Sequence, residues 1–296
     1  MVREIGRIIG QHSNTVIVQP HDGRSVFCRL RGRFKRQKIF PYIGDMIEFT
    51  RDGFGAGVVE NILPRQNFLT RPKVANVDQV VIITSFKKPP LDLLTLDTYI
   101  VLVEEASLDI LMVFNKSDLL TQKEKEKMRE VINVYDSLYE TVVVSALTRE
   151  NLWKLEEALS DKVSVFAGVS GVGKSSLLNA ISPTLKLKVN GVSKNGRGKH
   201  TTTTSTLLSL PFDGFVVDTP GFVSLSVEHI PVLNLQRYFK DIHDYSKKCF
   251  FSNCLHRDEV KCEVKKAVKK GKIVRSRYEN YLKLLERIER SIQNER

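Results

Sequence analysis

The chain has 296 residues, enough for two or three domains of ordinary size, and its composition of 42% hydrophobic and 27% charged residues is that of a soluble globular protein. No apolar run approaches the roughly 20 residues that a membrane-spanning helix needs, and the N-terminus lacks the apolar stretch of a secretory signal, so we predict a cytoplasmic protein without a membrane partner. The formal net charge of +12 favours polyanions as partners, nucleic acid in particular, over a surface charged only for solubility.

Residues 1–69 are predicted to form a small all-β domain. Five strand-like segments alternate with turn residues and show no helical period: 7–10, 15–19, 25–32, 45–50 and 57–63. A closed barrel accounts for this pattern, and the OB-fold is the commonest such barrel that binds nucleic acid. We therefore predict an N-terminal OB-fold domain that binds RNA.

A basic segment, RLRGRFKRQK, lies between two of these strands at residues 29–38. It has six cations in ten positions: Arg29, Arg31, Arg33, Lys35, Arg36 and Lys38. A run of this kind can neutralise several phosphates, so we predict that it binds RNA and that the binding weakens with salt. The alternative is a solvated hairpin loop with no ligand.

Residues 70–225 change to alternating apolar strands and helical segments, which is typical of an α/β sheet with parallel pairing. Strands are expected at 77–84, 110–114, 140–146 and 163–167, and helices at 93–107, 121–138 and 151–160.

The stretch GVSGVGKSS follows the last of these strands and opens a helix, as a phosphate-binding loop does. Its backbone N–H groups would surround the phosphates of a nucleotide, Lys174 would reach the β- and γ-phosphate oxygens, and Ser175 would bind Mg²⁺. All nine residues are predicted to contact the nucleotide: Gly168, Val169, Ser170, Gly171, Val172, Gly173, Lys174, Ser175 and Ser176.

Two further motifs favour guanine as the base. NKSD follows the strand at 110–114, and the carboxylate of Asp118 can accept hydrogen bonds from both N1–H and the exocyclic amine of guanine. Adenine offers no such pair of donors. The predicted base site comprises Asn115, Lys116 and Asp118 with Ser145 and Ala146, because the strand-end SAL can donate a backbone N–H to the guanine O6.

A fourth motif, DTPG at 218–221, follows an apolar strand and predicts Asp218 near Mg²⁺ and the Gly221 N–H at the γ-phosphate. An ordinary GTPase has its phosphate loop first and NKxD last, whereas this chain has the reverse order. A circular permutation explains it, because joining the natural ends of the domain and cutting elsewhere leaves each strand in place in the sheet.

The segment 190–206, NGVSKNGRGKHTTTTST, is predicted to be the first switch, and Thr202 or Thr203 to bind Mg²⁺. Phe222 holds the position where many GTPases have a water-orienting glutamine. His200 is therefore our candidate for orienting the attacking water, with Lys174 as the other catalytic residue. The alternative is that His200 contacts phosphate or RNA.

Residues 226–296 are predicted to be mostly helical and to bind zinc. The cluster CFFSNCLHRDEVKC supplies Cys249, Cys254, His256 and Cys262, and three thiolates with one imidazole suit a closed, structural Zn²⁺ site. Unligated buried cysteines are the alternative, and His243 is a spare ligand. The last helix has an apolar stripe for core packing: Tyr278, Tyr281, Leu285, Ile288 and Ile292.

These residues together resemble the circularly permuted, ribosome small-subunit-dependent GTPases of bacteria, the RsgA-type proteins also called YjeQ or YloQ. The resemblance covers essentially the whole chain and includes the GRGKHTT switch, DTPG followed by an apolar residue, and the zinc cluster. It implies slow Mg²⁺-dependent GTP hydrolysis that the small ribosomal subunit stimulates, contact with rRNA, and a role in late small-subunit maturation. We also expect a monomer that binds GTP and GDP.

Two other classes share part of this pattern. A metabolic kinase or ATPase would have the phosphate loop but no use for NKSD. An RNA-binding module that holds GTP only as a structural ligand would explain the barrel, the zinc domain and the charge, and Phe222 in the glutamine position gives that alternative some force.

Overall fold

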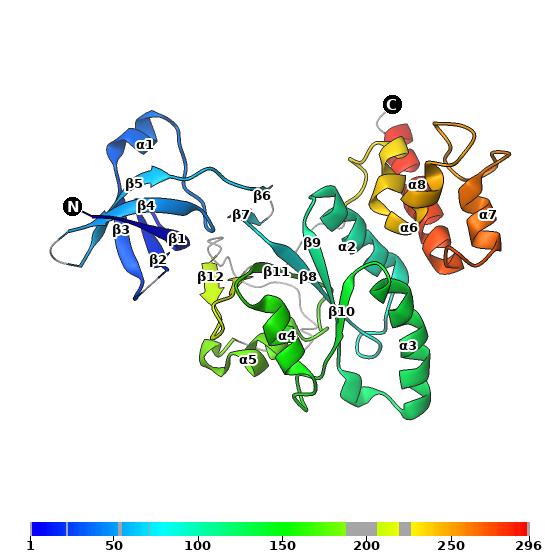
Figure 1. The fold of residues 1–296 in the computed structure, drawn as a ribbon, viewed down its shortest axis with the longest axis horizontal. Coiled ribbons are helices and arrows are strands. Elements are labelled where there is room, and N and C mark those ends of the chain that lie inside the picture. The colour runs from blue at the N-terminus through cyan, green and yellow to red at the C-terminus, as the bar shows by residue number, and fades with distance from the viewer. Residues whose placement is uncertain are drawn as a thin grey trace. The chain divides into compact units, whose positions relative to one another are not determined.

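The computed structural model describes residues 2–21, 23–52, 55–70, 72–187, 206–218 and 226–294 (Figure 1). The chain forms two compact units, each assembled from several stretches of sequence. One comprises Met1–Val80, Trp153–Phe166 and Leu178–Val223, and the other Val81–Leu152, Ala167–Leu177 and Ser224–Arg296. These units do not coincide with the sequence domains 1–69, 70–225 and 226–296, whose boundaries stay predictions.

The predicted N-terminal barrel is confirmed. Its strands close in the order β1-β2-β3-β5-β4: β1 (Arg3–His12), β2 (Thr15–Pro20), β3 (Val26–Leu30), β4 (Met46–Arg51) and β5 (Gly57–Ile62). Burial alternates along each strand, so that every second side chain, such as Val16 and Val18 on β2, points into the barrel. The β3–β5 pair is parallel and the other pairs are antiparallel, which gives an OB-like barrel.

The basic segment is not a hairpin loop, which corrects the alternative considered from the sequence. It spans the end of β3 and a five-residue helix, α1 (Gly32–Arg36). Phe34 is buried in the barrel core, whereas the six cations of the segment are all exposed or half-buried. One apolar anchor inside a run of charges therefore fixes the segment on the barrel and leaves its charges outside.

A six-stranded sheet has the order β10-β9-β8-β11-β13-β12. Its strands are β8 (Gln79–Ser85), β9 (Asp109–Asn115), β10 (Glu140–Val143), β11 (Val163–Ala167), β12 (Thr206–Ser209) and β13 (Phe215–Asp218). The pairs β10–β9 and β11–β13 are parallel as predicted, but β12 pairs antiparallel with β13. The turn after Ser209 is too short for a crossover, so these two strands form a hairpin. A two-stranded β6 (Phe68–Thr70) and β7 (Lys73–Ala75) was not predicted.

Helices follow the strands at the predicted places. They are α2 (Leu93–Glu105), α3 (Gln122–Asp136), α4 (Leu152–Leu159) and α5 (Lys174–Ile181), with 3₁₀ turns η1 (Ser117–Leu119) and η2 (Pro183–Leu185). Local signals start two of them. The Asp92 side chain accepts hydrogen bonds from the N–H groups of Leu94 and Thr95, and Thr121 and Glu124 form a capping box at α3.

The C-terminal part is helical as predicted: η3 (Val232–Tyr238), α6 (Lys240–Ser246), α7 (Glu263–Lys269) and α8 (Arg275–Asn294). In the apolar stripe of α8, Tyr281, Leu285 and Ile288 are fully buried, which confirms core packing for them, whereas Ile292 is 37% exposed. Among the described residues, no helix has the length and apolarity needed to cross a membrane.

Arg277 on α8 is buried, although its charge places it outside the apolar stripe. Its guanidinium forms ion pairs with Asp97 of α2 (Nη1–Oδ1 2.5 Å) and Asp241 of α6 (Nη2–Oδ1 2.9 Å). Asn280 and Tyr135 also donate hydrogen bonds to Asp97. Burial alone would lower the pKa of Arg277, but the two carboxylates outweigh it and raise that pKa well above its ordinary value. The charged guanidinium therefore ties α8 to α2 and α6.

We expect the substitution Arg277→Met to lower the free energy of unfolding by about 3–5 kcal/mol, because Asp97 would stay buried without its cation. Denaturant unfolding followed by circular dichroism measures the change. The matched control is Arg275→Met, which removes an 84%-exposed guanidinium one half-turn away and is expected to change stability by less than about 0.5 kcal/mol. Equal midpoints for the two variants would show that the buried pair does not hold this part of the fold.

Candidate functional site

The predicted phosphate loop connects β11 to α5. Two of its glycines are required by the local backbone. Gly168 has φ +137° and a Cβ there would lie 2.2 Å from the Ile83 carbonyl oxygen, and Gly173 has φ +101° and a Cβ there would lie 2.4 Å from Asn115 Nδ2. Any other residue would push the loop away from the two strands that support it.

Lys174, at the start of α5, folds back over the loop that precedes it. Its Nζ donates hydrogen bonds to the carbonyl oxygens of Gly168 (2.7 Å) and Val169 (3.0 Å). Partial burial lowers the pKa of Lys174 from its ordinary value. The ammonium therefore lies within the curve of the loop, where a bound phosphate would replace the carbonyl oxygens as its partner.

Asn115 of NKSD connects three of the predicted motifs. Its Nδ2 donates to the carbonyl oxygen of Val172 in the phosphate loop (2.9 Å), and its Oδ1 accepts from the backbone N–H of Ala146 (3.2 Å). The side chain is only 3% exposed, so both bonds are shielded from water. The structure thus brings the phosphate loop, NKSD and SAL together as the sequence predicted, although the motifs are far apart in the chain.

Lys116 and Asp118, the other two residues of NKSD in the predicted base site, also contact neighbouring motifs. Lys116, in the left-handed region at φ +65°, donates to the carbonyl oxygens of Gly171 (2.5 Å) and Lys88. The Asp118 carboxylate accepts a hydrogen bond from Ser145 Oγ (2.6 Å). Lys116 therefore covers the phosphate loop while Ser145 orients the carboxylate that is predicted to select guanine.

Sequence reasoning missed Glu150, which supports this base site from behind. Its carboxylate accepts a hydrogen bond from Ser117 Oγ (2.6 Å), and its carbonyl oxygen accepts from the Ser145 N–H (3.2 Å). Glu150 thus forms hydrogen bonds with both NKSD and SAL and holds the two motifs together. A glutamate in a charged stretch gives no sequence signal for this role, because both contacts depend on the turn that follows Ser145.

A cavity of about 340 Å³ lies beside the phosphate loop. It is lined by Val169 and Ser170 of the loop, by the end of β8, by Pro89 and Pro90, and by the start of α2 up to Tyr99. Its wall is mostly apolar, and neither NKSD nor SAL contributes to it. The predicted guanine site is therefore a different place from this cavity.

Several predicted residues lie outside the described part of the chain. These are His200, Thr202, Thr203 and Gly221. Asp218 ends strand β13 as expected, but its side chain is likewise not described. The catalytic and Mg²⁺ assignments of these residues stay predictions.

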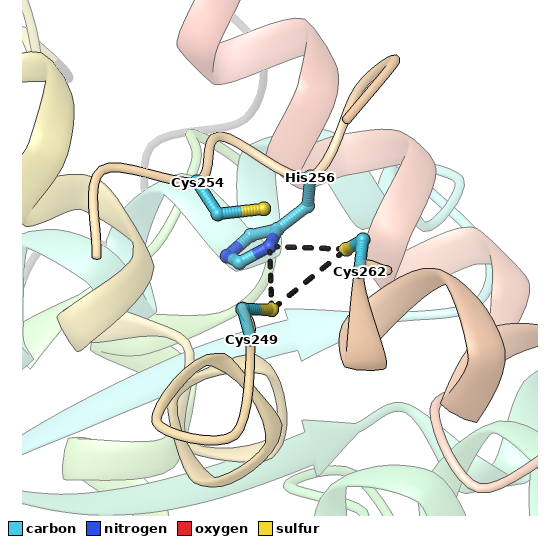
Figure 2. A group of neighbouring side chains, drawn as sticks. All are labelled: Cys249, Cys254, His256 and Cys262. Atoms are coloured by element: carbon cyan, nitrogen blue, oxygen red, sulfur yellow. Dashed lines mark hydrogen bonds between the residues drawn. The ribbon is translucent and has the colours of Figure 1, made fainter. Parts of the chain in front are cut away.

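The predicted zinc ligands converge on one point between α6 and α7 (Figure 2). Their four ligand atoms all lie within 4.8 Å of one another. The sulfurs of Cys249 and Cys262 are 3.9 Å apart, and His256 Nδ1 is 3.7 Å from the former and 3.4 Å from the latter. Tetrahedral zinc with Zn–S bonds of about 2.3 Å needs sulfurs about 3.8 Å apart, so the residues fit this ion.

The surroundings of the cluster also suit a metal. Burial lowers the pKa of His256 to about 4, which keeps the imidazole in its neutral, metal-binding form. Burial raises the pKa of Cys254 to about 12, so this thiol would become the metal-binding thiolate only with a cation beside it. Backbone N–H groups of Glu263 and Lys265 lie 3.4 Å from the sulfurs of Cys249 and Cys262, respectively. His243, the spare ligand, is not part of the group.

Comparison with known proteins matches two families in succession along the chain. The model of the RsgA N-terminal domain matches residues 5–59, and that of the RsgA GTPase matches residues 62–228. A relative from Thermotoga petrophila, named Small ribosomal subunit biogenesis GTPase RsgA, is 48% identical over 285 residues, which is 96% of each chain. This chain belongs to the RsgA GTPase family.

Solved structures of RsgA-type proteins have the same fold. The crystal structure of YjeQ from Thermotoga maritima matches with a TM-score of 0.85 and 44% identity, over 97% of this chain and 99% of that one. The structure of YloQ, described as a circularly permuted GTPase, matches with a TM-score of 0.83 and 33% identity, over 97% of this chain and 96% of that one. RsgA-family membership confirms the prediction of a GTP-hydrolysing enzyme with an N-terminal barrel and a circularly permuted GTPase domain.

Proposed function

We propose that this chain binds the small ribosomal subunit, hydrolyses GTP when it is bound there, and acts in the cytoplasm in late maturation of the subunit. The observation that carries the proposal is the 48% identity over nearly the whole chain to a relative named for small-subunit biogenesis. Asn115 of NKSD forms hydrogen bonds with both the phosphate loop and SAL, and this convergence of motifs supports guanine nucleotides, GTP and GDP, as the ligands.

The basic segment is the proposed rRNA contact of the barrel. Arg31 pairs with Glu60 (2.5 Å), and Arg33 donates to the Glu60 carbonyl oxygen and to Asn61. Within the described residues, the other four cations form no ion pair: Arg29, Lys35, Arg36 and Lys38. We therefore divide the segment into two arginines that also hold it on the barrel and four cations available to phosphates.

Residues of the nucleotide site have the following proposed roles. Lys174 and the backbone N–H groups of residues 168–173 stabilise the negative charge that develops on the transferred phosphoryl group. Mg²⁺ bound with GTP would supply further neutralisation of that charge, with Ser175, Asp218 and either Thr202 or Thr203 as its proposed ligands. The sequence places Arg197, Lys199 and His200 beside these threonines, and we propose that rRNA contacts this segment and brings His200 to the attacking water.

The C-terminal part is proposed to hold one structural Zn²⁺ through Cys249, Cys254, His256 and Cys262. Beside this cluster, Phe250 is 67% exposed, and the Lys261 ammonium lies 4.7 Å from the centre of its ring. Exposed aromatic rings next to cations suit contact with unpaired bases, so this face supports RNA binding as well. We propose that the protein acts as a monomer with domains at 1–69, 70–225 and 226–296.

GTP hydrolysis by the purified chain is expected to rise at least about tenfold when small ribosomal subunits are added, and the substitution His200→Ala is expected to remove that rise while subunit binding persists. Phosphate release under saturating GTP and co-sedimentation with the subunits are the two measurements. His12→Ala, in the barrel, is the matched control. Equal rates with and without subunits would leave GTP as a structural ligand of an RNA-binding protein.

The double substitution Lys35→Glu and Arg36→Glu is expected to weaken binding to small subunits and to make its salt dependence shallower, by about one unit of slope for each lost phosphate contact. Affinity measured between about 50 and 200 mM salt gives the slope. Lys123→Glu with Lys127→Glu, on α3, makes the same change in net charge outside the barrel. If both pairs act alike, general charge rather than this segment attracts the subunit.

A further inference from the structure

His256 presents its two ring nitrogens to two different environments. Nδ1 faces the sulfurs of Cys249 and Cys262, as Figure 2 shows, at 3.7 and 3.4 Å. Nε2 lies on the other side of the ring, 2.8 Å from the side-chain oxygen of Gln236 on η3. The ring is fully buried, so Gln236, and not water, is the partner of Nε2.

The orientation of the Gln236 amide decides which atom faces the ring. Its Nε2 donates a hydrogen bond to the Leu233 carbonyl oxygen (3.1 Å), one turn earlier on η3. An amide with its nitrogen committed to a carbonyl can offer only its oxygen to His256, and an oxygen accepts but cannot donate. The proton of a neutral imidazole therefore belongs on Nε2, and the lone pair on Nδ1 points to the sulfurs.

The backbone of His256 is held as firmly as its ring. His256 has φ +64°, in the left-handed region, and its carbonyl oxygen accepts a hydrogen bond from Tyr278 (2.6 Å). The Glu259 carboxylate accepts from the N–H groups of Leu255 and Arg257, on either side of it. Rotation of the ring about its own side-chain bonds is the freedom that remains, and the bond to Gln236 removes it.

We propose that Gln236 is a positioning residue of the metal site, which selects Nδ1 of His256 as the ligand atom and holds the ring toward the three sulfurs. The inference rests on the zinc site proposed above and deepens it. Hydrogen-bond partners behind a histidine ligand orient the ring and increase its basicity, and their loss typically lowers metal affinity 10- to 100-fold.

Gln236→Leu is expected to lower the affinity of the full-length chain for Zn²⁺ about 10- to 100-fold, measured by competition with a chromophoric chelator. Gln236→Glu keeps an acceptor oxygen and is expected to retain the wild-type affinity or exceed it. The matched control is Asn234→Leu, which makes the same amide-to-alkyl change on η3 at a side chain with no hydrogen bond to the cluster, and it is expected to have no effect. Rescue by glutamate separates positioning from a general disturbance of η3.

¹⁵N NMR of the histidine rings in the zinc-loaded chain gives a readout independent of affinity. We expect Nδ1 coordination with a proton on Nε2 in the wild type, and loss of that single pattern for His256 in Gln236→Leu. Coordination through Nε2 in the wild type, or equal affinity and equal spectra for Gln236→Leu, would overturn the role of Gln236 and leave the zinc site standing. A wild-type chain that binds no Zn²⁺ would overturn both.

Discussion

Removal of Zn²⁺ is expected to unfold residues 249–272 of the chain while α8 keeps its place. Structural zinc sites bind with apparent free energies of about 10–16 kcal/mol, and that energy is folding energy because no such site exists in the unfolded chain. Apart from the metal ligands, the buried side chains of this segment are those of Val264 and Ala267, whereas Phe250, Phe251 and Val260 are exposed. Helix α7 also begins at a ligand, because the Cys262 sulfur accepts a hydrogen bond from the Lys265 N–H.

Hydrogen exchange before and after chelation, with zinc measured by mass spectrometry, tests this expectation. Protection is expected to vanish at the amides of Glu263 and Lys265, which donate to the ligand sulfurs, and to persist around Tyr281 and Leu285. Cys28→Ala removes the cysteine in the barrel core and is expected to leave one zinc per chain. Unchanged exchange in residues 249–272 after complete loss of zinc would show that the segment folds by itself.

Asp118→Asn is expected to lower the affinity for GTP about 10²- to 10⁴-fold and to create affinity for XTP. A carboxylate accepts hydrogen bonds from both N1–H and the exocyclic amine of guanine, and each hydrogen bond to a charged group contributes about 1.5–3 kcal/mol. An asparagine amide presents one acceptor and one donor instead. Xanthine has an oxygen where guanine has the amine, so the new donor finds a partner there.

Titration of the purified protein with labelled GTP and XTP gives the two affinities. The matched control is Asp136→Asn, an exposed aspartate at the end of α3, which is expected to change neither. Retained GTP affinity without XTP binding would place the base elsewhere, for example in the cavity beside Tyr99. If the wild type and both variants bound ATP as tightly as GTP, the nucleotide site would not select its base.

Local residue patterns were enough to predict the barrel, the strand-to-helix position of the phosphate loop, NKSD at the end of β9 and the convergence of the four predicted zinc ligands. Each of these depends on residue types within a few positions of one another. Helix α1 was missed because charge dominates the basic segment and a single buried Phe34 gives no period. The hairpin of β6 and β7 was missed because three-residue strands cannot show alternation.

The supporting residues were missed for a different reason. Arg277 lies 180 positions from Asp97, and Gln236 lies 20 positions from His256. Glu150 contacts NKSD 33 positions earlier in the chain. In each case the polar side chain lies on an element whose own sequence shows no motif, and it finds its partner only when a second element packs against it. Spacing along one stretch of sequence contains no information about such pairs, whereas it does determine the ligand geometry of a metal-binding loop.

The buried position of Arg277 limits how the C-terminal part of this chain could be exchanged for another. A zinc-binding tail grafted from an unrelated protein would leave Asp97 on α2 without the guanidinium and the Asn280 amide that now surround it. We therefore expect the tail and α2 to change together, with substitutions at Asp97, Arg277 and Asn280 compensated by one another. A gene fragment that ends after residue 225 would encode a GTPase domain that lacks part of its own interior.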